Sequence, residues 1–214
     1  MSLDCPDLSL KYPTPADYQR LLGLVGVKDE DVLLAVRVGS RVYGTAQPDS
    51  DEDFMVVLSG DVKDDLLIRD KVNVTLRTKA GFQSSLDKQN VFALECYMVD
   101  FNNIFKRTPP AFNWKGDWGK LRLEALEKSQ SDYAKAVRGP LMDYKAKKRL
   151  WHSLRVPMFA KQVYQDGWIR DFTEANELYW EIMTDPSDAA EYYANVWGAQ
   201  RLTLIDSMAP SKGV

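Results

Sequence analysis

"VGSRVYGTAQPDSDEDFMVVL" (residues 38–58) begins with a Gly-Ser pair, continues through a polar loop and ends in an apolar run. The pair follows the apolar segment 31–39, whose Val and Leu residues are typical of a strand. "SRVYGT" is typical of the first turn of a helix, and residues 53–58 predict a second strand. The stretch therefore predicts a strand, a tight turn with a short helix, and a returning strand.

Two aspartates stand at the start of the second strand. Because side chains alternate faces along a strand, Asp51 and Asp53 should point the same way and Glu52 the other way. Two carboxylates this close repel each other unless a cation lies between them, and Mg²⁺ prefers oxygen ligands of this kind. Upstream, backbone N–H groups at Gly39 and the Ser40 hydroxyl are suited to phosphate oxygens. The alternative is a plain polar loop, "TAQPDSDED", between two strands.

The chain changes character near residue 110. A third strand is predicted at 71–77, and helices are predicted at 15–25 and 80–99, the latter broken near Asn90. After a Pro- and Gly-rich connector the pattern is helical, with the predicted helices at 120–138, 141–166, 172–183 and 187–207. The Asp-Pro-Ser-Asp segment 185–188 predicts a cap for the last of them. We expect an α/β (α+β) domain at 1–110, with a mixed sheet of four or five strands, and an α-helical domain at 111–214.

Composition excludes several classes of protein. The 214 residues are 45% hydrophobic with a formal charge of −3, so the chain can bury a core and has no general basic field for nucleic acid. Cys5 and Cys96 form no metal or redox motif and are interpreted as reduced thiols. The first residues lack the apolar core of a signal peptide, and no run of about 18 apolar residues could span a membrane. We expect a soluble cytoplasmic protein.

Taken in order, these features resemble the signature of the DNA polymerase beta superfamily of nucleotidyltransferases. The longer stretch "GSRVYGTAQPDSDEDFMVV" resembles in particular the minimal RNA-ligase-associated (RlaP-like) nucleotidyltransferases. Two later stretches, "FQSSLDKQNVFALECY" (82–97) and "KKRLWHSLR" (147–155), resemble helices of the same family. The resemblance implies that Gly39, Ser40 and Tyr43 bind the nucleotide and that an Asp-x-Asp pair binds metal.

One position departs from the family pattern. The superfamily usually has a third carboxylate on a neighbouring strand, and here that position holds Asn73. Asparagine keeps an oxygen for metal or water but carries no charge and takes no proton. Three interpretations remain open: a weakened or inactive relative that only binds nucleotide, a replacement carboxylate at Glu95 or Asp70, or an alignment that is off by a residue or two.

A basic helix supplies the last candidates. Lys148, His152, Arg155 and Phe159 share one helical face, while Leu150, Trp151, Leu154 and Met158 face another, suited to a core. The resemblance makes Lys148 and Arg155 candidates for the nucleotide phosphates, and His152 for the base or a phosphate. The alternative is a solvated charged face. Glu95, within an apolar run, needs a partner if buried, and a salt bridge to the basic helix would supply one.

The sequence thus predicts transfer of a nucleoside monophosphate from an NTP to a hydroxyl acceptor, with Mg²⁺ or Mn²⁺ held by Asp51 and Asp53. The acceptor could be an RNA end, a protein side chain or a small molecule. A catalytically weakened nucleotide-binding or antitoxin-like interaction module is the alternative, and a purely structural domain is the third. The sequence predicts no membrane partner and leaves the oligomeric state open.

Overall fold

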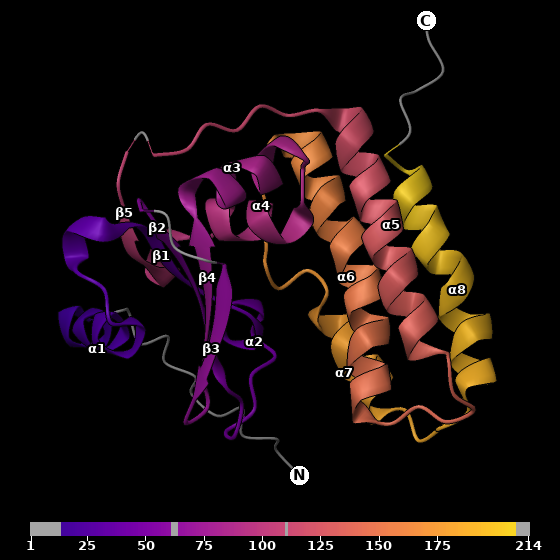
Figure 1. The fold of residues 1–214 in the computed structure, drawn as a ribbon. Helices are drawn as coiled ribbons and strands as arrows, with labels where there is room; N and C mark the ends of the chain where they lie inside the picture. Colours follow the sequence, from indigo (N-terminus) through magenta and orange to yellow (C-terminus); the bar gives the residue numbers. More distant parts are fainter. Residues whose placement is uncertain (1–13, 61–63, 110, 209–214) are drawn as a thin grey trace, which may run out of the picture.

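A computed structural model describes residues 14–60, 64–109 and 111–208 (Figure 1). The N-terminal part is a mixed five-stranded sheet flanked by helices, and the C-terminal part is helical, so the predicted α+β fold class is confirmed. The strands are β1 (Val32–Val38), β2 (Glu52–Leu58), β3 (Asp65–Arg69), β4 (Val72–Thr78) and β5 (Ile104–Arg107). Their order is β3-β4-β2-β1-β5, with β2 and β4 parallel and the other pairs antiparallel.

The three predicted strands correspond to the three central ones. β2 lies between β1 and β4, and its residues Phe54–Leu58 are all buried, as expected for a strand covered on both faces. The two edge strands, β3 and β5, were not predicted individually. β3 is largely exposed and β5 has four residues of intermediate burial, so neither has the apolar run that marks a central strand.

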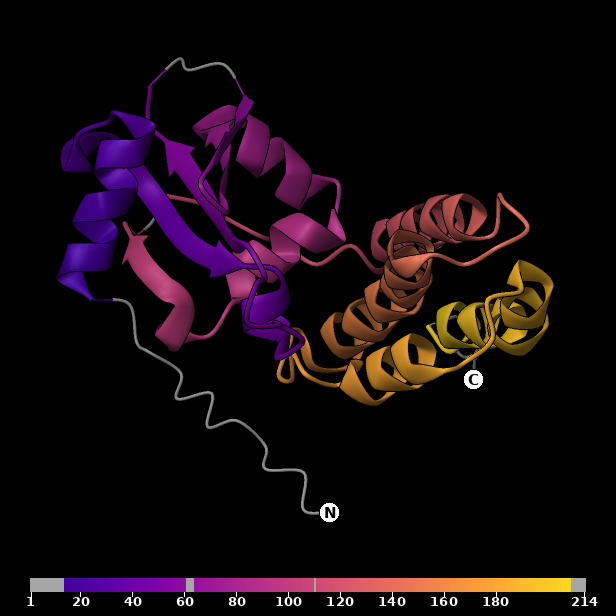
Figure 2. The ribbon, with the colours of Figure 1, turned by 90° about the horizontal axis from the view of Figure 1, so that it is seen from below.

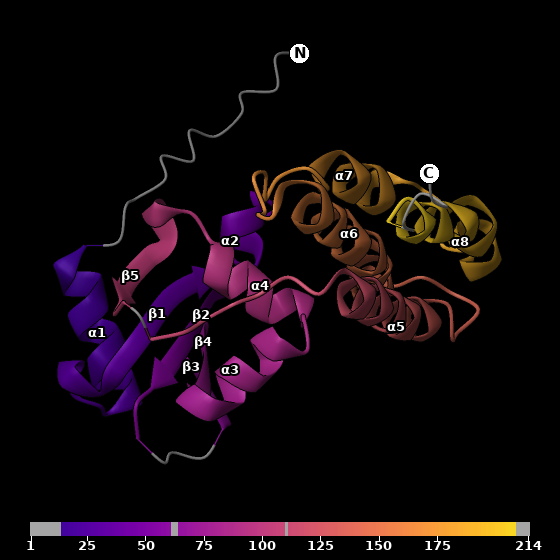
Figure 3. The ribbon, with the colours of Figure 1, turned by 90° about the horizontal axis from the view of Figure 1, so that it is seen from above.

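Eight α-helices complete the described chain: α1 (Pro15–Val25), α2 (Ser40–Tyr43), α3 (Lys79–Asp87), α4 (Val91–Met98), α5 (Trp118–Ala136), α6 (Tyr144–Asp166), α7 (Asn176–Thr184) and α8 (Ala190–Asp206). The predicted break near Asn90 is confirmed, since Asn90 is the N-cap of α4 and its side chain accepts from the Ala93 N–H. The break lets α3 and α4 take different directions over the sheet (Figure 3).

The predicted cap of the last helix is wrong. α8 begins at Ala190, and its N-cap residue, Ala189, makes no side-chain cap bond. Pairing between two chain segments explains the later start: the Met142 N–H donates to the Asp188 carbonyl and the Ala190 N–H to the Pro140 carbonyl. The same pairing delays α6, which begins at Tyr144 under an Asp143 cap. Hydrogen bonds between two segments of the chain therefore occupy backbone groups that the local sequence pattern assigned to helices.

Each face of the sheet has its own apolar cluster. On one face, α1 packs Leu21 and Leu22 against alternate residues of β1, β2 and β4. On the other, α3 and α4 cover the sheet, and their cluster continues into α5, α6, α7 and α8. Figures 2 and 3 show the helical part lying beside the sheet unit, on the side of α4 and α2. The core is thus continuous from β1 to the helices of the C-terminal part.

The aromatic residues of the last helices only partly form that core. Tyr193 and Trp197 are buried, but Trp168, Trp180 and Tyr192 are each about two-fifths exposed. Helical spacing alone did not distinguish the two groups, because which flank of a helix is covered depends on its neighbours.

Other expectations concern thiols and membranes. Cys96 is a free, buried thiol, whereas Cys5 and the N-terminal segment lie outside the described residues. In the described ranges, no helix combines the length and apolar character needed to cross a membrane.

Candidate functional site

The Gly-Ser turn and the aspartates meet at one end of the sheet. β1 and β2 are antiparallel with Val38 opposite Asp53, so the end of β1 lies beside the start of β2. Gly39 has φ +78°, and a Cβ there would lie 2.4 Å from Asp53 Oδ2. The turn therefore requires glycine on two grounds, backbone conformation and the close approach of a carboxylate. α2 follows at once and ends at Gly44 in the left-handed region.

Asn73 joins the two aspartates into one cluster. β4 is parallel to β2 and pairs Asn73 with Asp53. The Asn73 amide Nδ2 donates to Asp53 Oδ1 at 2.9 Å and to Asp51 Oδ2 at 3.3 Å. Both carboxylates therefore face one common point, as predicted from their alternation, although Asp51 itself stands just before the strand.

No further carboxylate completes this cluster. Within the described ranges, no three or more His, Cys, Asp or Glu side chains are grouped so that they could hold a metal ion. Asp70 lies in the turn between β3 and β4 with φ +43°, and Glu95 is engaged in a buried ion pair. The amide of Asn73 stands where a third charge was expected.

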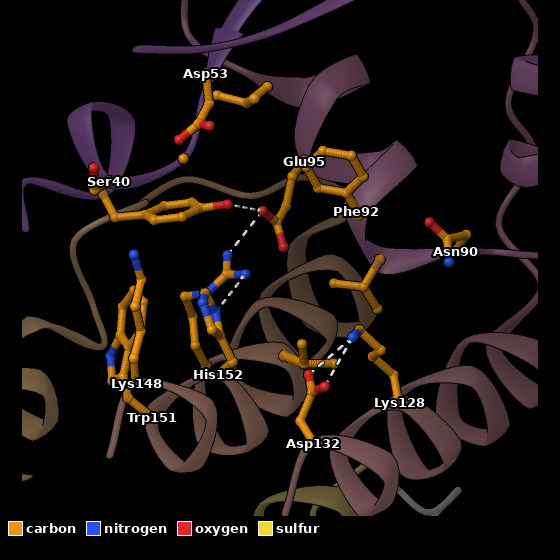
Figure 4. Close-up of a pocket in the computed structure, with 16 residues that line it drawn as sticks. Ser40, Asp53, Asn90, Phe92, Glu95, Lys128, Asp132, Lys148, Trp151 and His152 are labelled. Carbon is orange, nitrogen blue, oxygen red and sulfur yellow. Dashed lines mark hydrogen bonds and ion pairs between the residues drawn. The ribbon is translucent and has the colours of Figure 1, made fainter. Parts of the chain in front are cut away.

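A cavity of about 520 Å³ opens between the sheet unit and the helical part. Figure 4 shows Ser40 and Asp53 on one side and side chains of α6 on the other. The predicted residues that line it are Gly39, Ser40, Tyr43, Asp53, Glu95, Lys148, His152 and Arg155. Asp51 and Asn73 do not line the cavity, although Asn73 is hydrogen-bonded to Asp53, which does. The fold thus brings together residues from three sequence blocks, of which the first and the last, at Gly39 and Lys148, are 109 positions apart.

A buried ion pair joins the two sides of the cavity. Arg155 Nη1 lies 2.8 Å from Glu95 Oε2, and both side chains are at most 6% exposed. The Tyr43 hydroxyl donates to the same Glu95 oxygen, and the Arg155 guanidinium lies over the Tyr43 ring, 4.0 Å from its centroid. The salt bridge that was one of the two readings of Glu95 is therefore present.

Burial and charge shape the protonation of this group. Burial acts to lower the pKa of Arg155, but the Glu95 carboxylate and the Tyr43 hydroxyl together outweigh it and hold that pKa above its usual value. Burial raises the pKa of Tyr43 well above its usual value; Arg155 opposes this and Glu95 reinforces it. Arg155 thus stays a cation and Tyr43 a neutral hydrogen-bond donor.

His152 is held in its neutral form. Burial lowers its pKa well below the usual value, and the charges of Arg155, Lys148 and Lys128 act in the same direction. Arg155 Nη2 lies 3.3 Å from His152 Nδ1, and because a guanidinium can only donate, Nδ1 is the acceptor. The proton of the neutral ring is therefore on Nε2, which makes that atom a donor.

The cavity also contains residues that the sequence did not indicate. Lys128 and Asp132 form an ion pair of 2.9 Å on α5, and Asn90 and Phe92 enter from the start of α4. Trp151, expected in the core, is buried with its Nε1 donating to the Ala175 carbonyl, and it lines the cavity as well. A Lys-Asp pair four residues apart on a helix is common, so no local signal marked this one.

Comparison with known proteins bears on the sheet unit. The family model described as "Nucleotidyltransferase domain" matches residues 23–115, a segment that contains all five strands with α2, α3 and α4. No curated protein matches the chain. The match is consistent with the DNA polymerase beta-like superfamily, while the finer resemblance to the RlaP-like group stays a prediction. The strand–turn–strand framework and the Asp-x-Asp pair both lie within this match, so residues 23–115 are similar to a nucleotidyltransferase domain.

Proposed function

We propose that the protein transfers a nucleoside monophosphate from an NTP to a hydroxyl acceptor and releases pyrophosphate, with Mg²⁺ or Mn²⁺ as cofactor. The observation that carries this proposal is the contact between the Gly39 turn and Asp53, which puts a phosphate-binding turn and a carboxylate at one mouth of a cavity. In the reaction, the acceptor oxygen bonds to the α-phosphorus, the bond from that phosphorus to the pyrophosphate oxygen breaks, and the hydroxyl proton leaves to a base.

The residues present fit a divalent cation. Asp51 and Asp53 direct oxygens toward the same small donor, the Asn73 amide, so one cation at that point would meet both carboxylates. A half-turn of the Asn73 side-chain amide would exchange its nitrogen for an oxygen ligand. When bound, Mg²⁺ would neutralise phosphate charge and orient the acceptor oxygen.

The chain's own groups would hold the triphosphate. Ser40 and the backbone after Gly39 are suited to its oxygens. Lys148 lines the same cavity and, within the described chain, forms no ion pair, so its ammonium group is the stronger candidate for a phosphate contact. Figure 4 shows its side chain extending from α6 toward Ser40. Arg155 is committed to Glu95, so we assign it to holding α6 against α4, with His152 beside it.

Nucleotide binding is tested first by thermal unfolding. Wild type and Asp53→Ala are heated with each of ATP, GTP, CTP and UTP, with and without Mg²⁺. A ligand at a hundred times its Kd stabilises the native state by about 2.7 kcal/mol, so a Mg²⁺-dependent rise in Tm is expected for at least one NTP. Asp53→Ala should lose this rise and Asp49→Ala, an exposed loop control, should keep it. A full rise in Asp53→Ala would contradict the metal assignment.

Transfer is tested by pyrophosphate release. Loss of either Asp51 or Asp53 should abolish release, because no third acidic ligand remains among the described residues. Ser40→Ala should mainly weaken NTP binding and so raise KM. Unchanged turnover in Asp53→Ala would refute the proposed chemistry.

One observation favours the second candidate, a weakened enzyme that only binds nucleotide. The Asn73 amide nitrogen donates a hydrogen bond to both aspartates, so a neutral donor occupies the position where a third acid was expected. Asn73→Asp separates the two candidates: a rise in pyrophosphate release indicates a decayed site, and no change indicates that the wild-type site is complete. In this second candidate the helical part would bind another protein, as in an antitoxin-like module.

Two further features belong to the proposal. The division into domains 1–110 and 111–214 and the cytoplasmic location stay predictions. The acceptor is an RNA end, a protein side chain or a small molecule, and each of these carries the hydroxyl that the reaction needs.

A further inference from the structure

A second cavity, of about 1110 Å³, lies on the other side of α2 from the proposed nucleotide site. Arg37 of β1 and Arg41 of α2 form part of one wall. The opposite wall comes from the connection between α6 and α7, with Trp168 and Phe172. Figure 3 shows this connection beside α2, and a Cβ on Gly44 would lie 3.1 Å from Asn176 Nδ2 there. The cavity therefore has Arg37 and Arg41 on one wall and aromatic rings on the other, with four carboxylates also among its lining residues.

The carboxylates of this cavity have partners within the protein. Glu52 accepts from Arg20 at 3.1 Å, and Asp17 accepts from the Thr14 backbone in a helix cap. Asp100 accepts from the Asn102 N–H. Asp171 accepts from the backbone and hydroxyl of Thr173, and Arg170 pairs with Asp166 on α6. These acids are thus already used in holding local structure.

Arg41 is hydrogen-bonded to the backbone rather than to a carboxylate. Its Nη2 donates to the Ser50 carbonyl at 3.1 Å, which is a neutral acceptor. Across the part of the chain that the structure describes, Arg41 makes no ion pair and its buried Nε has no hydrogen-bond partner. The guanidinium charge of Arg41 thus has no carboxylate partner among the described residues, and an anionic ligand in the cavity would supply one.

Arg37 adds a second cation nearby. It is half-buried, and its guanidinium lies 5.7 Å from the centroid of the Phe105 ring. Burial lowers the pKa of Arg37, Glu52 opposes this, and the charge of Arg41 reinforces it, so the two guanidiniums lie close enough to repel. A ligand with two negative charges would relieve that repulsion.

We propose that this cavity binds a phosphate monoester that carries an aromatic or apolar group, with the phosphate at Arg37 and Arg41 and the ring against Trp168 and Phe172. Guanidinium groups match phosphate oxygens in planar, paired hydrogen bonds. Sites for small ligands combine an apolar wall with a few fixed polar groups, as this cavity does.

The place of the cavity gives the ligand a role. Arg41 holds the carbonyl of Ser50, the residue directly before Asp51, and Gly44 and Ala46 of the same loop line the cavity. A bound phosphate monoester thus lies against the loop that leads into the proposed metal ligands. We assign a phosphate monoester that also carries a free hydroxyl as the acceptor, a role that rests on the proposed function, whereas its binding does not; phenyl phosphate, which has no hydroxyl, probes the binding alone.

The binding test uses phenyl phosphate, titrated by calorimetry into the full-length protein. Wild type should bind one equivalent, and binding should persist in the presence of saturating ATP and Mg²⁺ and in Asp53→Ala. Arg41→Gln should weaken binding at least about tenfold, the usual effect of losing a charge-assisted contact. Arg149→Gln, an exposed arginine of α6 outside both cavities, is the matched control.

A second variant keeps the test informative if Arg41→Gln unfolds. Trp168 is partly exposed, so Trp168→Ala should fold. Wild type should bind phenyl phosphate several-fold more tightly than methyl phosphate, and in Trp168→Ala this preference for the phenyl ester should fall toward unity. No binding to wild type, displacement by ATP, or unchanged affinity and preference in the variants would overturn the site. Binding of phenyl phosphate by a protein that binds none of the four NTPs, with or without Mg²⁺, would leave the site standing and refute the proposed function instead.

Discussion

At the scale of single residues, position 39 imposes two constraints that, of the amino acids, only glycine satisfies. Its φ of +78° lies in the region that side chains rarely adopt, and a methyl group would meet Asp53 Oδ2 at 2.4 Å. We expect Gly39→Ala to lower the free energy of unfolding by about 1–3 kcal/mol, the usual cost of such strain. Urea unfolding measures this change.

Gly23 provides the control for that substitution. It lies in α1 with open space around its Cα, so Gly23→Ala should raise stability by up to about 1 kcal/mol through helix propensity. If Gly39→Ala were as stable as Gly23→Ala, the close approach of the turn to Asp53 would be wrong.

His152, the sole histidine of the chain, predicts a pH dependence. Its folded-state pKa is depressed, so below about pH 6.5 the unfolded state binds a proton that the native state does not. Stability should therefore fall as the pH drops from 7 toward 5, by at most about 1.4 kcal/mol per pH unit.

The measurement compares urea unfolding of wild type and His152→Gln at pH 7.5, 6.0 and 5.0. The variant should show a flatter dependence in this window. The aspartates with lowered pKa, such as Asp17 and Asp185, should contribute only at more acidic pH, near and below about pH 4. Equal slopes for both proteins would show that His152 is not held neutral.

At the scale of elements, the pair Glu95–Arg155 links α4 to α6 across the cavity. Removing one partner leaves a buried charge uncompensated, so Arg155→Met or Glu95→Gln should each cost about 3–5 kcal/mol. The double variant Glu95→Gln with Arg155→Met should cost clearly less than the sum, because neither charge then remains buried.

The exposed pair Arg122–Asp206, with an N–O distance of 2.9 Å, is the comparison. Its removal by Arg122→Met should cost about 1 kcal/mol or less, since solvent screens such pairs. Additive costs in the Glu95–Arg155 double variant would contradict direct coupling between the two elements.

At the scale of the whole molecule, one apolar cluster joins the sheet unit to the helical part. Leu34 of β1, Leu94 of α4, Leu121 of α5 and Leu150 of α6 belong to it and are fully buried. We therefore expect one cooperative thermal transition, with equal calorimetric and van't Hoff enthalpies. Two separate transitions would instead show that the predicted division at residue 110 marks domains of independent stability.

Much of this architecture could be predicted from the sequence, because local signals were strong where burial is continuous. The run "FMVVL" marks a central strand, and Asn90 marks a helix start through its own side chain. The spacing between the Gly-Ser pair and the Asp-x-Asp pair likewise indicated that Gly39 and Asp53 lie at one end of the sheet. Edge strands and the start of α8 were missed, since their backbone partners come from distant parts of the chain.

By itself the sequence determined the strand–turn–strand framework and the candidate carboxylates, since both depend on periodicity within a few residues. Only the tertiary structure decided that Arg155 is bound to Glu95, that the Asn73 amide lies between the aspartates, and that Arg41 faces a second cavity. Each of those facts depends on contacts between residues about 20 to 130 positions apart in the sequence. A charged side chain contacts such a partner only once the chain has packed, because burial without a partner is unfavourable.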